Sequence, residues 1–261
     1  MNSTSELESS WTDFKKWWIG RQMPIRDAAP LTTYEHHPLI SSAMNVSNCV
    51  IAVIDIKSMK YIYNSPNYAE FAGWDEKDIK EGGVQYAFSQ IHPDDVPGVV
   101  QFSELINTYF QKLPNEEKGF YRSYWDFGVF TKEKKYLKVL QHDCAIKYDD
   151  EGKIDELLVF VSKVDGLIAS DSQHLRITNG KESFFFKYEH KTKINLLLEN
   201  LSPREMEVVR LIAKSMSMKE IAAHLGISFN TVKVHSAHMM RKLKARNSIE
   251  MINLLRLWGY I

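Results

Sequence analysis

Polar and basic side chains recur at helical spacing near the C-terminal end of this 261-residue sequence. One helix face carries Asn230, Lys233, Val234, Ala237 and Arg241, and the opposite face is apolar. Short side chains let a helix approach base edges in the major groove of DNA, and basic side chains pair with phosphates. The pattern therefore predicts nucleic-acid binding, although a solvated basic helix on an ordinary helical bundle has the same spacing.

Helix start and stop signals make this helix the third of four short helices between residues 201 and 255. A hydroxyl followed three residues later by Glu forms a capping box, and Gly can end a helix in the left-handed conformation. The capping residues are Ser202 with Glu205, Ser217 with Glu220, and Ser228, and the terminating glycine is Gly226. A short helix, a turn containing Gly and a longer helix make the helix-turn-helix geometry.

The same segment resembles the LuxR-type DNA-binding domain. The motifs that carry the resemblance are Leu201-Ser202-Pro203-Arg204-Glu205, Lys219-Glu220-Ile221-Ala222, Leu225-Gly226-Ile227-Ser228, Thr231-Val232-Lys233-Val234-His235 and Lys242-Leu243. The resemblance implies that Lys233 and Val234 meet base edges, and that Thr231, His235 and Arg241 lie near the DNA backbone. The residues expected at the DNA are Ser228, Asn230, Thr231, Lys233, Val234, His235, Ala237, His238, Arg241 and Lys242.

The last helix is apolar almost all round, which is more apolar surface than one small core needs. The resemblance implies a dimer contact there, and we assign it to Ile249, Ile252, Leu255 and Trp258. Alternatively, part of this surface covers another domain of the same chain. The sequence leaves both possibilities open.

The composition predicts two domains of opposite charge. Residues 191–261 hold 12 Lys and Arg against 5 Asp and Glu, a net charge of +7, and the preceding residues hold 21 against 28, a net charge of −7. A basic C-terminal part is typical of nucleic-acid binding. Cys49 and Cys144 lack a paired spacing, which argues against a disulfide framework or a zinc site. Because no apolar run reaches membrane length and no secretory start is seen, we expect a cytoplasmic protein.

The region between residues 46 and 166 has the strand and helix order of an α+β domain. The predicted strands are residues 50–56, 60–64, 120–130, 136–148 and 154–164. The predicted helices are residues 66–73, 75–80 and 94–112. This order predicts an antiparallel sheet with its helices to one side. The expected fold class is thus α+β, with a sheet and flanking helices followed by an all-α four-helix domain.

This order resembles a PAS domain, a sensory and dimerising module. The landmarks are Asn64-Ser65-Pro66-Asn67, Phe71-Ala72-Gly73-Trp74, His92-Pro93-Asp94-Asp95, Arg122 with Phe127-Gly128, and Asp150-Glu151-Gly152. The resemblance implies a pocket between sheet and helices, which holds either a small-molecule ligand or a packed core. The sequence lacks the flavin-binding stretch of some relatives, and neither His92 nor His142 suits a haem ligand, so no cofactor is assigned.

Two further segments flank the PAS-like domain. Residues 4–19 are predicted to form an amphipathic helix that packs on the following domain, contacts a second subunit or covers the pocket. Asn179-Gly180 predicts a hairpin that packs on the PAS sheet, on the DNA-binding domain or on a second subunit. The consecutive Phe184, Phe185 and Phe186 require cover on both faces of its second strand.

These elements divide the chain into four predicted units. The units are an N-terminal helix and connector at residues 1–45, the PAS-like domain at 46–166, the added hairpin and linker at 167–198, and the LuxR-type domain at 199–261.

Together the patterns predict a DNA-binding transcription regulator, a homodimer in which the PAS-like domain controls the helix-turn-helix. The alternative is a signalling or scaffold protein whose helix-turn-helix is not used for sequence-specific DNA binding. The Thr231-Val232-Lys233 face and the net charge of +7 favour the regulator. The sequence lacks a phosphate-binding glycine loop, a metal-ligand spacing and a nucleophile motif, so we expect no enzymatic activity.

Overall fold

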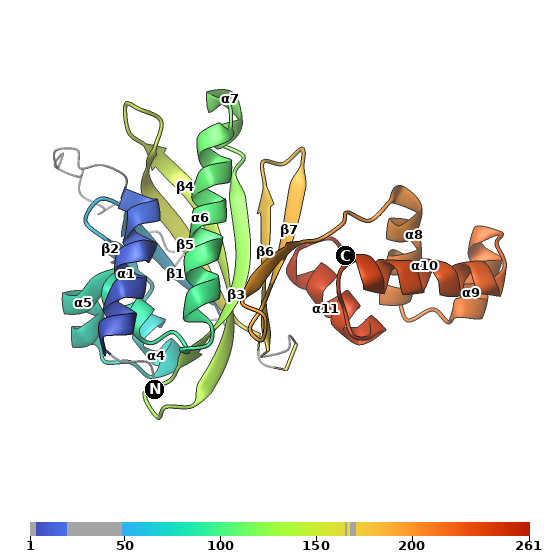
Figure 1. The fold of residues 1–261 in the computed structure, drawn as a ribbon, viewed down its shortest axis with the longest axis horizontal. Helices are drawn as coiled ribbons and strands as arrows, with labels where there is room; N and C mark the ends of the chain where they lie inside the picture. The colour runs from blue at the N-terminus through green and yellow to red at the C-terminus, as the bar shows by residue number, and fades with distance from the viewer. Residues whose placement is uncertain (1–3, 20–48, 165, 168–170) are drawn as a thin grey trace.

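The computed structural model describes residues 4–19, 49–164, 166–167 and 171–261, and it consists of two adjoining units (Figure 1). A sheet flanked by helices forms the N-terminal unit, and four helices form the C-terminal unit. This arrangement confirms the fold class expected from the sequence. The predicted connector at residues 20–45 lies outside the described residues.

Within the described residues, eight strands form one antiparallel sheet in the order β2-β1-β5-β4-β3-β6-β7-β8. The strands are β1 (Cys49–Asp55), β2 (Lys60–Asn64), β3 (Arg122–Phe130), β4 (Tyr136–Tyr148), β5 (Ile154–Lys163), β6 (Ser172–Thr178), β7 (Ser183–Glu189) and β8 (Ile194–Leu197). The first five correspond to the strands predicted for the PAS-like domain. The polar Asp149–Gly152 turn joins β4 to β5, with Gly152 at a φ of 74°.

Helices cover one face of the first five strands. The helices are α1 (Thr4–Ile19), α4 (Tyr68–Ala72), α5 (Glu76–Ser89), α6 (Val96–Lys112) and α7 (Asn115–Lys118). α6 buries Phe102 and Ile106 completely in the core. The sequence predicted that the helix at residue 75 ends at residue 80, but α5 continues to Ser89. It continues because Gly83, at a φ of 58°, lets the chain kink and resume the helix.

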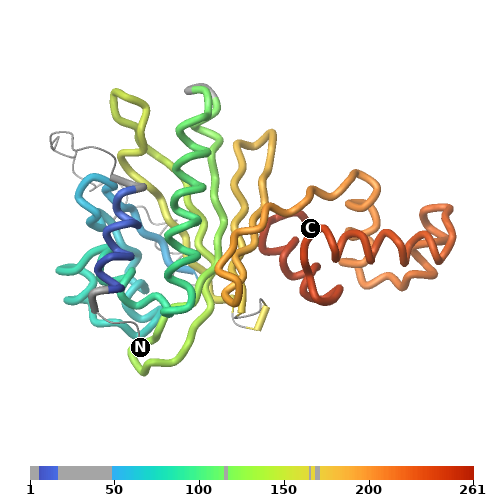
Figure 2. Tube along the Cα trace, in the orientation of Figure 1, coloured from blue at the N-terminus to red at the C-terminus, as the bar shows by residue number. Residues whose placement is uncertain are grey.

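α1 packs on the domain that follows it. It lies beside α6 (Figure 2), and it also contacts α5. Its Trp11 and Phe14 are buried, with ring centroids 5.2 and 4.9 Å from that of Phe88. Packing on the following domain, one of the three roles considered for this helix, is therefore observed.

The added hairpin extends the sheet rather than lying on one of its faces. β6 pairs with the first half of β3, and β7 pairs with β6, so the hairpin continues the ladder beyond β3. Residues 191–200, expected to be a connector, instead include β8, which pairs with β7. The predicted Asn179-Gly180 turn is present: the Asn179 Oδ1 atom accepts hydrogen bonds from the backbone N–H groups of Lys181 and Glu182.

A buried charge network joins the added strand β6 to the rest of the sheet. The Lys138 Nζ atom lies 2.8 Å from Asp126 Oδ1 and 3.7 Å from Asp95 Oδ2. The backbone N–H and the ring of His174, on β6, contact the second oxygen of Asp126 at 2.9 and 3.0 Å. Burial tends to raise the pKa of Asp126, but Lys138 and His174 outweigh it and lower the pKa. The carboxylate therefore stays charged and holds three strands together.

The C-terminal unit has the four helices predicted from its capping residues. They are α8 (Pro203–Ala213), α9 (Met218–Leu225), α10 (Phe229–Lys242) and α11 (Ser248–Leu257). Both predicted capping boxes are formed, at Ser202 with Glu205 and at Ser217 with Glu220. Gly226 ends α9 at a φ of 64°, and the Ser228 Oγ atom accepts a hydrogen bond from the backbone of Thr231. The helix-turn-helix is therefore formed by α9 and α10.

Asp143 is a buried carboxylate next to the core of the N-terminal sheet. Its Oδ2 atom accepts hydrogen bonds from Trp125 Nε1 at 2.7 Å and Ser123 Oγ at 3.0 Å, and Oδ1 accepts one from Gln141 Nε2 at 2.8 Å. Burial raises the pKa of Asp143 to about 6, although the three donors oppose this shift. Among the described residues no ion pair offsets the burial, and the charged form is therefore costly.

We predict that Asp143→Asn changes the pH dependence of stability. Because the pKa of Asp143 is higher in the folded protein than in the unfolded chain, the wild type loses stability relative to the variant as the pH rises from 4 to 7. The shift corresponds to roughly 3 kcal/mol. Urea unfolding of both proteins at several pH values measures it, and parallel curves would contradict this role of Asp143.

Candidate nucleic-acid interface and internal cavity

α10 has one buried face and one exposed face, as its sequence predicted. Val232 and Met239 are fully buried in the four-helix core, with Ser236 between them. The opposite face is exposed to solvent and carries six of the residues expected at DNA. These are Asn230, Lys233, Val234, Ala237, His238 and Arg241.

The other residues expected at DNA are less exposed or already bound within the domain. Ser228 is occupied as the N-cap of α10, and Thr231 and His235 are half-buried at the side of the helix. The Lys242 Nζ atom lies 2.7 Å from the Glu205 carboxylate and donates to the Asn200 carbonyl at 3.3 Å. Lys242 is therefore bound within the domain, where it holds the C-terminal end of α10 to the start of α8.

Phe229 is an exposed residue that the sequence analysis did not single out. It begins α10 and is 43% exposed, next to Asn230 and one turn before Lys233. The Lys233 Nζ atom lies 5.9 Å from the centre of its ring. The sequence signal for Phe229 is its spacing of four residues from Lys233, which the helical pattern assigns to the exposed face. An apolar side chain here can contact a thymine methyl group.

The residues assigned to a dimer contact on α11 are largely buried within this one chain. Ile249 is 72% exposed, whereas Ile252, Leu255 and Trp258 are buried. Trp258 packs on Phe185 of β7, with 4.6 Å between ring centroids. For Trp258, the alternative that this surface covers another domain of the same chain is therefore the one observed.

The contact between the units is a continuous apolar cluster. Leu140, Val164, Phe185 and Leu198 contribute from the sheet, and the core residues of the four helices complete the cluster. Phe185 points to this side, while its neighbour Phe184 points to α6 and lies 5.5 Å from the ring of Tyr109. The prediction that both faces of this strand need cover is therefore confirmed.

Polar groups surround this apolar contact. Arg176 of β6 donates a hydrogen bond to the carbonyl of Trp258, and its guanidinium lies 5.1 Å from the ring of Tyr124 and 4.9 Å from that of Tyr260. The Lys187 Nζ atom donates to the Lys244 carbonyl at 2.9 Å. These contacts involve the end of the chain and the turn after α10. Asn230, Lys233 and Val234 stay exposed, whereas Arg241 lines a hollow that it shares with Asp94 and Asp171 of the N-terminal unit.

A cavity lies between the sheet and the helices of the N-terminal unit, where the PAS resemblance placed a pocket. Its volume is about 90 Å³, and its walls are mostly aliphatic and aromatic. Phe14 of α1 forms part of the wall, so this helix also helps to cover the cavity. The residues that line it include Val50, Ile54, Met59, Tyr61, Tyr68, Phe88, Ile91, Trp125, Phe127, Gln141 and Leu157.

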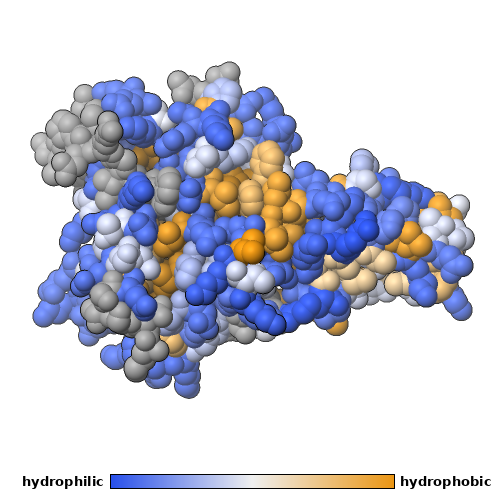
Figure 3. Space-filling model, viewed as in Figure 1, coloured by the Kyte–Doolittle hydropathy of each residue, from blue (hydrophilic) through white to orange (hydrophobic). Residues whose placement is uncertain are grey.

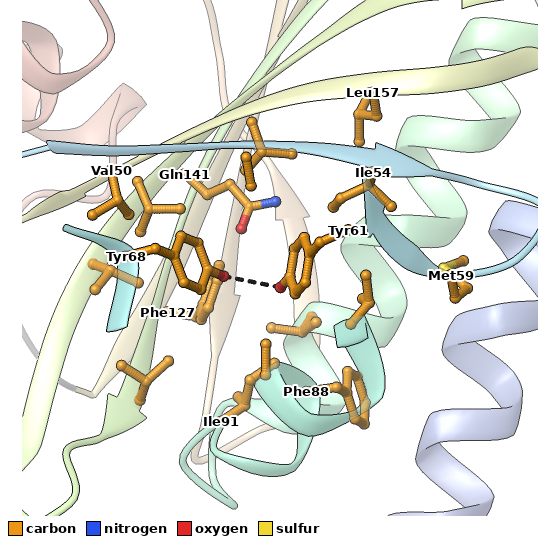
Figure 4. A pocket seen from close by; sticks show the side chains of 18 of the residues that line it. Val50, Ile54, Met59, Tyr61, Tyr68, Phe88, Ile91, Phe127, Gln141 and Leu157 are labelled. Atoms are coloured by element: carbon orange, nitrogen blue, oxygen red, sulfur yellow. Dashed lines mark hydrogen bonds between the residues drawn. The ribbon is translucent and has the colours of Figure 1, made fainter. Parts of the chain in front are cut away.

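Three polar side chains interrupt this apolar wall. The hydroxyl groups of Tyr61 and Tyr68 point at each other, 2.9 Å apart, with the amide of Gln141 beside them (Figure 4). Burial raises the pKa of Tyr68 to about 12 and raises that of Tyr61 well above its usual value. Both hydroxyls therefore stay protonated near neutral pH and can donate or accept hydrogen bonds.

The candidate cofactor ligands lie away from this cavity. His92 belongs to the turn before α6, where its Nδ1 atom accepts a hydrogen bond from the backbone of Asp94 at 3.3 Å. The ring of His142 packs on that of Tyr124, and burial and Arg176 lower its pKa to about 4. Among the residues that the structure describes, no group of His, Cys, Asp and Glu side chains could hold a metal ion. None of the described helices is long and apolar enough to cross a membrane.

The C-terminal unit matches a known protein family. The family model for bacterial regulatory proteins of the luxR family (GerE) matches residues 199–255. Nodulation protein W of Bradyrhizobium diazoefficiens is 39% identical over 71 residues, 26% of this chain and 31% of that protein. The nitrate/nitrite response regulator protein NarL of Escherichia coli is 42% identical over 53 residues, 20% of this chain and 24% of that protein. The match to these relatives thus spans a quarter to a third of their length, and residues 199–255 form a luxR-family helix-turn-helix domain.

Solved structures also show similarity. A Vibrio cholera VqmA-ligand-DNA complex aligns with 87% of this chain and 90% of its own, at 17% identity and a TM-score of 0.32. The N-terminal domain of a diguanylate cyclase with a PAS/PAC sensor, from Marinobacter aquaeolei, aligns with 44% of this chain and 94% of its own. Its identity is 21% and its TM-score is 0.35.

We predict that Phe185→Ala uncouples the two units. The substitution removes the ring that packs on Trp258 and should cost about 3 kcal/mol of the contact. In scanning calorimetry the single unfolding transition expected of the wild type should split into two. Phe184→Ala is the matched control, because its ring faces α6 and its loss should lower the stability without splitting the transition. Two identical unfolding profiles would contradict this role of Phe185.

Proposed function

We propose that this chain is a transcription regulator in which the N-terminal sensor unit controls DNA binding by the C-terminal helix-turn-helix. The observation that carries the proposal is the free face of α10 within a luxR-family domain. The relatives that share this domain are regulatory proteins, which favours a regulator over an enzyme. Because its target is DNA, the protein would act in the cytoplasm.

DNA recognition would depend on the N-terminal half of α10. Lys233 and Val234 are exposed there and would meet base edges in the major groove, with Phe229 beside them. Arg241 lies about two turns further along and would contact a phosphate, since the family resemblance places it near the backbone. Lys242 is bound to Glu205 and would support the position of the helix instead.

Control would pass through the added strands. Trp125 lines the cavity and pairs with Leu175 of β6, and β6 carries the Arg176 that binds the carbonyl of Trp258. A change in cavity packing that shifts β3 would thus move the strand on which the DNA-binding domain rests. Such a route requires that the two arrangements of the contact differ in DNA affinity.

The cavity suggests a small, mostly apolar ligand with one hydrogen-bonding group. At about 90 Å³ it is of the same order as an apolar cavity of ~150 Å³ that takes up benzene. The groups available for a polar atom are the hydroxyls of Tyr61 and Tyr68 and the Oε1 atom of Gln141, whose Nε2 atom donates to Asp143. We propose an aromatic or heteroaromatic ring with one hydroxyl or carbonyl group.

A scaffold role, in which the helix-turn-helix does not bind specific DNA, is the alternative. The free face of α10 and the net charge of +7 on residues 191–261 favour the regulator. A homodimer would bind two half-sites separated by whole turns of DNA.

We predict different effects from two basic residues of α10. Lys233→Ala should reduce the preference for specific over random DNA about 10- to 100-fold, since it removes a base contact. Arg241→Ala should weaken binding to all sequences alike and reduce the salt slope by about 1. Fluorescence anisotropy at several salt concentrations measures both effects, with Lys77→Ala on α5 as the control. Normal specificity in Lys233→Ala would sink the assignment of this helix.

We predict that Gln141→Leu separates polar from apolar binding in the cavity. The affinity for phenol should fall about fivefold, because one hydrogen bond is lost, while that for benzene should stay within a factor of two. Both ligands can be followed by the thermal shift of the full-length protein. If neither ligand shifts the melting temperature of the wild type, the ligand proposal is wrong and the cavity is only a packing defect.

A further inference from the structure

The outer edge of β8 is an unprotected sheet edge. Natural proteins usually protect such edges with charged side chains, proline or a bulge. β8 reads Ile-Asn-Leu-Leu, without any of these, and its Ile194 and Leu197 are 54% and 64% exposed. β2, at the other end of the described sheet, begins with Lys60 and has a register shift in its pairing with β1. The edge strand β2 therefore has features that oppose pairing with a further strand, and the edge strand β8 lacks them.

The backbone of β8 offers alternate groups for pairing. The Leu198 N–H donates to the Phe185 carbonyl at 2.7 Å, and Leu196 is the residue opposite Lys187. Because hydrogen-bonding direction alternates along an antiparallel strand, Leu196 bonds to β7 and the backbone groups of Asn195 and Leu197 point outward. Two residues, separated by one, are thus available to a further strand.

The side chains beside this edge are apolar. Leu197 is paired with Phe186 of β7, and Phe184 lies one step further along the same face. Hydrophobic residues gather on the surface between α6 and the DNA-binding unit, over this region (Figure 3). A strand added at β8 would therefore cover apolar surface as well as satisfy backbone groups.

We propose that the partner at this edge is a second copy of this chain, whose β8 pairs antiparallel to the first. The charges that flank the strand are complementary when it pairs with itself. With the two-fold axis at Leu196, Asn195 of each copy lies opposite Leu197 of the other, so the outward backbone groups face each other. β8 ends at Ile194 and Leu197, and in this register Lys193, in the turn that precedes β8, comes close to Glu199, which follows β8 in the second copy. Both side chains are exposed.

The pairing forms one sheet across both copies and fixes the two DNA-binding units relative to each other. β8 leads through a short segment to Pro203, the first residue of α8. The two-fold axis is thus close to the start of both helix-turn-helix units, which a regulator of two half-sites requires. This use in DNA binding rests on the proposed function, whereas the dimer itself does not.

Charge reversal tests the register. In sedimentation velocity with the full-length protein, Lys193→Glu or Glu199→Lys should raise the dimer dissociation constant about tenfold, because each change creates two like-charged pairs. The double variant restores the opposite charges and should return to the wild-type value. Lys77→Glu, on α5, is the control. A monomeric wild type, or a dimer that ignores all of these changes, overturns the proposal.

A cysteine at the axis gives a second test. In a protein with Cys49 and Cys144 replaced by Ser, Leu196→Cys should form a disulfide dimer on mild oxidation. Residues facing each other at a non-hydrogen-bonded antiparallel position lie about 4.5 Å apart, within disulfide reach. Ile249→Cys, exposed on α11, should stay uncrosslinked. Crosslinking through Ile249→Cys instead would assign the dimer to α11 and overturn the proposal.

DNA binding by the same variants separates this proposal from the proposed function. A dimer that shows the charge rescue but selects no DNA sequence would contradict the regulator and leave the β8 interface standing. Sequence-specific DNA binding by a protein that remains monomeric throughout would support the regulator and overturn the β8 interface.

Discussion

Strand β7 carries large aromatic side chains on both of its faces, and other parts of the chain have to cover each face. Much of the architecture follows from this constraint. Phe184 and Phe186 face the α6 side, while Phe185 faces the DNA-binding unit and packs on Trp258 at 4.6 Å. One strand is therefore shared by two hydrophobic cores. Because the core of the helix-turn-helix unit includes residues of the sheet, the two units should not move independently without exposing apolar surface.

This shared strand gives the N-terminal unit a physical connection to the helix-turn-helix unit. Arg176 and Lys187 bind carbonyl groups near the end of the chain and after α10, so the sheet holds the domain by backbone as well as side-chain contacts. Among the described residues, the contact leaves Lys233 and Val234 of α10 exposed. Regulation would then act through a change in how the helix-turn-helix unit is presented.

Local signals predicted the elements well, and long-range pairing explains what they missed. The capping boxes at Ser202 and Ser217 are chemical features of neighbouring residues, so the four helices could be located from sequence. The three Phe residues of β7 showed that both faces need cover but not what covers them. Equally, nothing local reveals that Lys242 pairs with Glu205, or that residues 194–197 extend the sheet as β8. The helix predicted to end at residue 80 continues to Ser89 through a kink at Gly83, and a kink and a helix end can have the same local sequence.

Selection of preferred sites from random duplex DNA, with the full-length protein at a stated salt concentration, tests the central claim most directly. The account predicts enrichment of a short inverted repeat, with half-sites separated by whole turns of the helix. As the salt concentration is raised, the preference for the selected sequence should fall more slowly than the total affinity. The reason is that base contacts and phosphate contacts differ in salt dependence. If no sequence is enriched even at low salt, α10 does not read DNA, and the scaffold role takes the place of the regulator.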